Sequence, residues 1–129
     1  MNATVQVPQI LNIGQYLKDR PTEAVRTVLH QSTDMNLVLW QIPPQGNLPP
    51  HRHPSGEDIW LVLHGEADLI DDAAGSRRTI HAGESVVVGI EQTHGAINVG
   101  HEDLAMGRSR MGYLGRKGAS DPGTIRPAC

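Results

Sequence analysis

The stretch HRHPSGEDIWLVLHG, residues 51–65, decides how this chain folds and what it can hold. His51 and His53 are separated by a single residue, and the second half of the stretch, Ile59–Leu63, is an apolar run typical of a β-strand. Since residues i and i+2 of a strand project to the same face, the two imidazoles point together, as two ligands of one metal ion would. A His-x-His pair also arises by chance on protein surfaces, so the pair needs further ligands to define a site.

A carboxylate stands at the start of the apolar run. Asp58 shares a strand face with Trp60 and Val62. A carboxylate buried among apolar side chains is unfavourable unless a cation lies beside it. Asp58 is therefore a candidate metal ligand, and a solvated acid in a loop is the alternative. Glu57 is the other candidate carboxylate, but it falls on the opposite face, because a shift of one residue reverses the face of a strand.

A third histidine follows about forty residues later. Gly83–Val88 is typical of a turn followed by a buried strand, and the chain then continues to His94 and Asn98. An imidazole just beyond a buried strand is equally consistent with a core histidine and with a surface histidine. His94 becomes a candidate ligand only in combination with His51 and His53.

Working outward from these residues, short runs rich in Val, Ile and Leu alternate with turn residues such as those of Pro43–Gly46 and Asp71–Gly75. About eight strands with no helix between them predict an all-β protein, an antiparallel sandwich or jelly roll. The expected strands are Ala24–Leu29, Met35–Ile42, Asp58–Leu63, Glu66–Ile70, Arg78–His81, Ser85–Ile90, His94–Val99 and Leu104–Met111.

The two ends of the chain differ from this pattern. Near the N-terminus, apolar residues are spaced like one face of a short helix, which Asn12 would cap and Arg20-Pro21 would end; these residues are Ile10, Leu11, Ile13, Tyr16 and Leu17. The stretch 115–129 is rich in Gly, Pro and polar residues and is expected to be a loose tail. We expect one domain, residues 1–129, with a barrel over about 24–111.

The bulk properties exclude several functions. A chain of 129 residues fits a single domain, and a net charge of -3 with a pI of about 6.1 suggests neither a nucleic-acid partner nor an anionic membrane surface. The one cysteine, Cys129, allows no internal disulfide, which favours a reducing compartment. With no visible signal peptide and no apolar stretch long enough for a membrane span, we expect a cytoplasmic protein.

Together the histidines and the carboxylate resemble the two signature motifs of the cupin superfamily. The first motif is a Gly, five residues, His-x-His, three or four residues, a Glu, six residues and a Gly. The second is a Gly, five residues, Pro-x-Gly, two residues, a His, three residues and an Asn. The residues on register are His51, His53, Asp58 and Gly65 for the first motif, and Gly83, His94 and Asn98 for the second.

The chain departs from both motifs at defined positions. Gly46 comes one residue late for the first glycine, and Asp58 replaces the usual Glu. Gly89 and Glu91 replace the proline and the second glycine of the second motif. Glu57 fits the shorter step from His53 but leaves seven residues before the motif's final glycine.

The resemblance implies a double-stranded β-helix, that is, a jelly-roll barrel, with His51, His53, Asp58 and His94 around one divalent metal inside it. Three imidazoles and one carboxylate suit Fe, Mn, Co, Ni, Cu or Zn better than Mg or Ca. With a divalent ion this ligand set keeps a charge of about +1, which favours a small molecule bound through an anionic oxygen.

Three further residues are candidates for the pocket around the metal. Trp60 shares the face of Asp58 and could line the pocket or fill the core. Arg108 and Arg110 alternate onto one face of the last expected strand and could hold a substrate carboxylate, with a solvated sheet edge as the alternative.

Two functions remain open from the sequence. One is a metalloenzyme of the dioxygenase, isomerase or lyase class, acting on a small organic substrate that chelates through oxygen. The other is a non-catalytic, metal-dependent module that binds a small metabolite or sugar. The ligand set favours the enzyme, whereas the lack of an obvious acid–base residue beyond the ligands favours the binder.

We also expect a homodimer. Ile59, Leu61 and Leu63 are apolar on the strand face away from the site, while Trp60 and Val62 are apolar on the other face. A strand that is apolar on both faces is normally covered on both. The outer cover could be the edge of the second sheet, the N-terminal segment or a partner chain.

Overall fold

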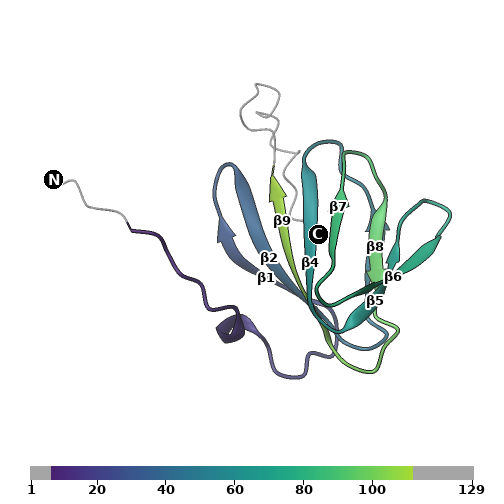
Figure 1. The fold of residues 1–129 in the computed structure, drawn as a ribbon, viewed down its shortest axis with the longest axis horizontal. Helices are drawn as coiled ribbons and strands as arrows, with labels where there is room; N and C mark the ends of the chain where they lie inside the picture. The colour runs from purple at the N-terminus through teal and green to yellow at the C-terminus, as the bar shows by residue number, and fades with distance from the viewer. Residues whose placement is uncertain (1–6, 112–129) are drawn as a thin grey trace.

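The computed structural model describes residues 7–111, which form nine strands and one short 3₁₀ turn (Figure 1). The 3₁₀ turn η1 spans Ile13–Tyr16. The strands are β1 (Val25–Gln31), β2 (Met35–Ile42), β3 (Asn47–His51), β4 (Glu57–His64), β5 (Glu66–Ile70), β6 (Arg77–His81), β7 (Ser85–Val88), β8 (His94–Ile97) and β9 (Leu104–Met111).

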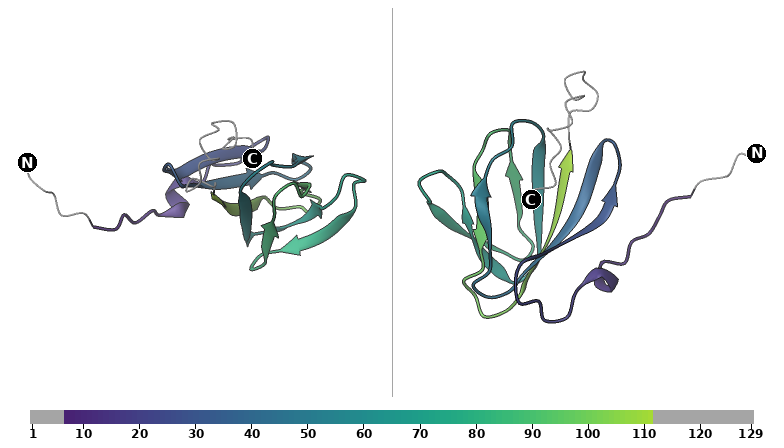
Figure 2. Two further views of the ribbon diagram at one scale, coloured as in Figure 1. Left: turned by 90° about the horizontal axis from the view of Figure 1, so that it is seen from above. Right: turned by 180° about the vertical axis from the view of Figure 1, so that it is seen from behind.

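The strands form two antiparallel sheets. One has the order β1-β2-β9-β4-β7, and the other has the order β3-β8-β5-β6. The two sheets face each other and enclose one apolar core (Figure 2). This arrangement confirms the predicted all-β jelly-roll barrel. None of the described residues forms a helix long and apolar enough to cross a membrane.

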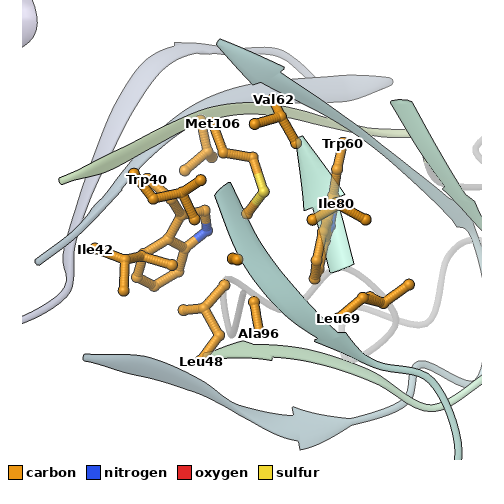
Figure 3. Packing of buried hydrophobic residues seen from close by; sticks show 12 residues of the cluster. Trp40, Ile42, Leu48, Trp60, Val62, Leu69, Ile80, Ala96 and Met106 are labelled. Atoms are coloured by element: carbon orange, nitrogen blue, oxygen red, sulfur yellow. The ribbon is translucent and has the colours of Figure 1, made fainter. Parts of the chain in front are cut away.

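Alternation along the strands builds the core. In β4 every second residue is buried, so that Trp60 and Val62 face inward while Ile59 and Leu61 stay exposed. Figure 3 shows side chains of the two sheets meeting across the interior. The labelled members of this core are Trp40, Ile42, Leu48, Trp60, Val62, Leu69, Ile80, Ala96 and Met106.

The strand β3 is a finding that the sequence pattern did not predict. It contains Pro49 and Pro50, which offer no backbone N–H to a neighbouring strand. The strand is tolerated because it lies at the edge of its sheet, where prolines are normally found. Its pairing with β8 also contains an irregularity, since Leu48 pairs with Ala96 and His51 pairs with His94.

That irregularity places one extra residue in β3, as a β-bulge does. Three steps along β3 from Leu48 to His51 correspond to two steps along β8 from Ala96 to His94. Leu48 is in the core, and Nε2 of His51 is also buried, so the two side chains face the same way despite their opposite parity. The bulge therefore turns His51 into the barrel.

The predicted N-terminal helix is wrong in extent. Only the 3₁₀ turn η1 forms, although Asn12 caps it as expected by accepting a hydrogen bond from the backbone N–H of Gly14 at 3.0 Å. Gly14 disfavours a regular helix, and no residue of the turn is buried, so tertiary packing does not stabilise a longer one. The predicted tail, 115–129, lies outside the described residues.

Asn98 ties the loops around the barrel together. It is fully buried, and its Nδ2 donates to the carbonyl oxygens of Ile42 and Glu102, both at 2.8 Å. Its Oδ1 accepts from the backbone N–H of Gly100 at 2.9 Å. Its backbone exchanges two further hydrogen bonds with Gln45 and Gly46. The motif asparagine is therefore a structural residue that connects the end of β2 with the loop before β9.

Candidate metal centre

Three histidines converge inside the barrel from two neighbouring segments. His51 ends β3, His94 begins β8, and these two residues are direct partners across the strands. His53 follows in the loop before β4. The ring centroids lie 4.2 Å apart for His51 and His94, 5.0 Å for His51 and His53, and 5.1 Å for His53 and His94. One ligand atom from each ring lies within 4.8 Å of the other two, so the cluster could hold a metal ion.

Backbone carbonyls orient two of these rings. Nδ1 of His51 lies 2.8 Å from the carbonyl oxygen of Pro49, and Nδ1 of His94 lies 2.9 Å from that of Gln92. Because a carbonyl oxygen only accepts, Nδ1 of each ring must carry the proton, and Nε2 then presents a lone pair. Metal-binding imidazoles are commonly oriented in this way, by a hydrogen bond from the ring nitrogen that does not bind the metal.

Nε2 of His51 is a buried polar atom with no hydrogen-bond partner among the described residues. Burial lowers the pKa of His51, and the nearby His94 and His53 lower it further, whereas the hydrogen bond to Pro49 opposes this shift in part. The lowered pKa favours the neutral imidazole. A buried, unpartnered nitrogen lone pair is what a metal ion would satisfy.

Asp58 approaches two histidines of the cluster from the facing sheet. Its side chain is buried, and its Oδ2 lies 3.4 Å from Nε2 of His53 and 3.3 Å from Nε2 of His94. Bonds of about 2.1 Å to a tetrahedral ion separate two donor atoms by roughly 3.4 Å. The spacing therefore fits donors around one ion. Glu57 is exposed on the opposite face of β4, which agrees with the parity argument for Asp58.

The structure places the side chain of one of the three candidate pocket residues, Trp60. Trp60 is fully buried and meets the ring of His94 edge-on at 5.7 Å, so it packs behind the histidines. Its Nε1 is a buried donor without an acceptor in the described part of the chain. The backbones of Arg108 and Arg110 pair with Trp60 and Asp58 of β4, but their side chains lie outside the described residues.

Two features near the site escaped the sequence analysis. Gly95 follows His94, and a Cβ atom there would lie 2.8 Å from the carbonyl oxygen of Leu48 and 2.9 Å from Cα of Pro50. Only glycine lets β3 and β8 approach closely enough to pair His51 with His94. A glycine inside a strand pattern often indicates close approach of another backbone. Gly95 was therefore the sequence signal for this close approach.

The second feature joins the two ligand-bearing loops. The backbone N–H of Glu91 donates to the carbonyl oxygen of His53 at 2.8 Å, and its carboxylate lies 3.4 Å from Nε of Arg52. Glu91 adopts a φ of 60°, a left-handed conformation that non-glycine residues rarely take. Contacts between distant loops of this kind leave no signal in local sequence.

A cleft of about 320 Å³ leads from the surface to His94, between the sheet edges formed by β6 and β7. Arg78 lines it, and Nε of Arg78 lies 2.6 Å from Oδ2 of Asp71 at its mouth. Thr93 and Val88 also line the cleft. The four other histidines lie on the surface and stay apart from the cluster: His30, His64, His81 and His101.

Comparison with known proteins agrees with this architecture. Residues 38–106 match the family described as the cupin domain. A protein with a double-stranded β-helix domain from Klebsiella pneumoniae is 28% identical, with a TM-score of 0.75 over 84% of this chain and 95% of that one. No curated protein sequence matches the chain.

Two more distant structures share the fold. KdgF from Halomonas sp. is 17% identical, with a TM-score of 0.67 over 81% of this chain and 94% of that one. A predicted oxalate decarboxylase from Thermotoga maritima is 20% identical, with a TM-score of 0.65 over 69% of this chain and 80% of that one.

Proposed function

Since this chain belongs to the cupin family, we propose that it is a mononuclear metalloenzyme whose metal is held by His51, His53, His94 and Asp58. The observation that carries this proposal is the buried Nε2 of His51, which has no hydrogen-bond partner in the described chain and belongs to a cluster of three imidazoles. A purely structural core would be expected to pair that nitrogen or to replace the histidine with an apolar residue.

The donor set limits the choice of metal. Three imidazole nitrogens and one carboxylate oxygen suit Fe, Mn, Co, Ni, Cu or Zn, whereas Mg and Ca favour oxygen ligands. Copper, nickel and zinc bind such sites more tightly than iron or manganese by intrinsic affinity. The metal found after purification therefore need not be the one that supports activity.

The charge of the site indicates the substrate class. Three neutral imidazoles and one carboxylate leave a charge of about +1 on a divalent ion, and four protein ligands leave one or two positions for a small molecule or water. A substrate that chelates through an enolate, carboxylate or phenolate oxygen suits this charge. When bound, such a metal would polarise a coordinated oxygen or, if redox-active, activate dioxygen.

Side chains near the histidines offer hydrogen-bonding groups to a bound substrate. The cleft between β6 and β7 gives access to His94, and its mouth carries the Arg78–Asp71 pair, which offers both donors and acceptors to a small polar molecule. Nε1 of Trp60 offers a hydrogen-bond donor next to His94. Donors buried close to a reacting oxygen are more effective than the same groups in water.

The test is turnover by chain reconstituted separately with Fe, Mn, Co, Ni and Zn. A panel of diketones, enols, catechols and uronic-type sugars is assayed under air and under nitrogen, with products identified by nuclear magnetic resonance. We expect metal-dependent conversion of at least one compound. Conversion that occurs under air and is lost under nitrogen would assign oxygenase chemistry. Conversion that persists under nitrogen would assign isomerase or lyase chemistry.

The matched variants are His51→Ala, which removes a proposed ligand, and His81→Ala, which removes an exposed histidine outside the cluster. Activity should disappear in the first and remain in the second. Tight binding of a panel compound without turnover under any metal would contradict the enzyme and favour the non-catalytic binder.

A further inference from the structure

A charged side chain leaves the four-stranded sheet on the same face as residues of the core. Arg78 of β6 is the direct cross-strand partner of Leu69 of β5, and Leu69 is in turn the partner of Ala96 of β8. Leu69 and Ala96 belong to the core, and directly opposed residues of an antiparallel pair project to the same face. Ile80, two residues beyond Arg78, is also in the core. Arg78 therefore projects from the inner face of the sheet.

Asp71 joins Arg78 beside the histidine cluster. Ile70 of β5 pairs with Gly95 of β8 in antiparallel register. Asp71 comes next on the first of these segments and His94 on the second, so these two residues lie at the same level. Nε of Arg78 donates to Oδ2 of Asp71 at 2.6 Å. The ion pair and a proposed metal ligand therefore belong to one wall of the barrel.

The cleft beside His94 is one part of a longer groove between β6 and β7, the edge strands of the two sheets. A second hollow of about 300 Å³ shares Leu69, Arg78 and Val86 with the cleft. The side chain of Arg78 lines both hollows and is 73% exposed. A small molecule in the cleft therefore has His94 and the Arg78–Asp71 pair in the same lining.

The ion pair keeps hydrogen-bonding capacity for a ligand. Its contact joins Nε of Arg78 to Oδ2 of Asp71. The two terminal nitrogens of the guanidinium and Oδ1 of the carboxylate make no hydrogen bond to any other residue of 7–111. Arginine has five N–H donors, and a carboxylate accepts through both oxygens. The pair can therefore offer donors and an acceptor side by side.

The charges along the cleft decide which chemical group suits the pair. Arg78 and Asp71 neutralise each other, and Asp72 is the remaining charged residue of the lining. Its Oδ1 accepts from the backbone N–H groups of Ala74 and Ser76, both at 2.9 Å, so it is engaged in its own turn. A second carboxylate on a ligand would meet two aspartates and one arginine, and an ammonium group would compete with Arg78 for Asp71. Hydroxyl groups are uncharged and both donate and accept, as the pair does.

We propose that the Arg78–Asp71 pair determines specificity by binding hydroxyl groups, and that the substrate is a polyhydroxy acid whose carboxylate end lies at the metal centre. This inference rests on the proposed function, which places an anionic oxygen of the substrate at the metal. One hydroxyl accepts from a terminal nitrogen of Arg78, and a hydroxyl on the neighbouring carbon donates to Oδ1 of Asp71. The aliphatic side chains of Leu69, Val86 and Val88 line the cleft and suit the C–H groups of such a chain.

The first test compares four acids that share one chelating end. These acids are gluconate, 2-hydroxyhexanoate, 2-hydroxyadipate and 6-amino-2-hydroxyhexanoate, which all carry a 2-hydroxy carboxylate on a chain of the same length. Isothermal titration calorimetry measures their binding to the zinc-loaded chain, and elemental analysis afterwards confirms that the metal is retained. We expect gluconate to bind at least about tenfold more tightly than each of the others, because a site built to hydrogen-bond hydroxyl groups rejects analogues that lack them.

The second test changes the pair itself. Arg78→Met should weaken gluconate binding about tenfold or more and leave 2-hydroxyhexanoate binding within about twofold. Asp71→Ala should also weaken gluconate binding, and it should strengthen 2-hydroxyadipate binding because it leaves the guanidinium without its carboxylate. The matched controls are Arg77→Met and Asp68→Ala, which break another ion pair of the same strands, at 3.6 Å. Arg77 and Asp68 line neither hollow, so both controls should bind gluconate as the unchanged chain does.

The metal content separates this inference from the proposed function. A metal-loaded chain that binds gluconate no better than 2-hydroxyhexanoate would overturn the inference alone, and so would a loaded chain that binds none of the four acids. Equal effects of Arg78→Met and Arg77→Met on gluconate binding would overturn it as well. A chain that takes up no metal would contradict the proposed function, and this inference with it.

Discussion

His51 and His94 face each other directly across β3 and β8, with their ring centroids 4.2 Å apart and each Nδ1 held by a backbone carbonyl. The pairing joins two strand ends that are far apart in sequence. A metal bound between them would link these strand ends only in the folded chain. Binding energy at this site is therefore also folding energy.

Removal of either histidine should abolish metal binding. His51→Ala and His94→Ala each delete one of the three clustered imidazoles, and we expect metal content after reconstitution and dialysis to fall from about one per chain to near zero. Elemental analysis by mass spectrometry measures this directly. The variant His81→Ala removes an exposed histidine and should retain the full metal content. An unchanged metal content in both cluster variants would show that the site is elsewhere.

Asp58, and not Glu57, should be the carboxylate ligand. Oδ2 of Asp58 lies within 3.4 Å of Nε2 of two histidines, while Glu57 is exposed on the other face of β4. Asp58→Ala should weaken metal binding about 10- to 100-fold or more, since even indirect partners of metal ligands contribute this much. Glu57→Ala should change it little. Competition titration with a coloured chelator compares the two, and the reverse order would move the ligand to Glu57.

Gly95→Ala should damage both stability and the site. The added Cβ would lie under 3.0 Å from backbone atoms of β3, which cannot move aside as a side chain can. We expect a loss of about 1–3 kcal/mol in the free energy of unfolding, with weaker metal binding because β3 carries His51. Gly107→Ala is the control, because the nearest atom to its added Cβ is 4.0 Å away. Urea denaturation of both variants, without metal, gives the comparison.

Asn98→Ala should destabilise the barrel without touching a metal ligand. It leaves the buried carbonyl of Ile42 without its donor and removes the contacts to Glu102 and Gly100. We expect a loss of about 2–4 kcal/mol in the free energy of unfolding. Asn47→Ala, at an exposed position of β3, should change it by less than about 0.5 kcal/mol. Equal effects of the two substitutions on the free energy of unfolding would show that Asn98 does not have this structural role.

Acidification should release the metal. Protons compete with metal for the imidazoles, so affinity falls as pH falls. Burial lowers the pKa of His51 below 6.5, so this ring stays neutral to a more acidic pH than in the unfolded chain. In the metal-free chain the neutral ring therefore contributes stability that is present above pH 6.5 and is lost as pH falls through the lowered pKa of the folded state. Thermal unfolding with and without metal between about pH 7 and pH 5 tests both expectations. The stabilisation by metal and the stability of the metal-free chain should each decrease as pH falls.

Much of the fold could be predicted because alternation is a local property. The period of two in β4 already put Asp58 and Trp60 on one face and Glu57 on the other, and the structure has the same arrangement. The order of apolar runs and turns likewise gave the strands and their class. The motif spacing placed His94 near the His-x-His pair, which periodicity alone did not do.

The remainder depended on contacts between distant parts of the chain. The strand β3 was not predicted, because Pro49 and Pro50 remove two backbone donors and only its edge position makes it acceptable. The cleft beside His94 brings Arg78 close through the approach of two sheet edges, which no local pattern encodes. The prediction of a short N-terminal helix was wrong for the opposite reason. Local spacing indicated the helix, but no tertiary packing stabilises it.

The extra residue in β3 makes the metal centre tolerant of a one-residue change in chain length. Deleting either Pro49 or Pro50 would leave two residue steps between Leu48 and His51, as many as separate their partners on β8, so regular pairing would keep both side chains facing the barrel interior. Replacing both prolines would keep the residue count and the direction of the ring. Among related chains with this site, a one-residue alignment gap between Leu48 and His51 should therefore be compatible with the histidine cluster.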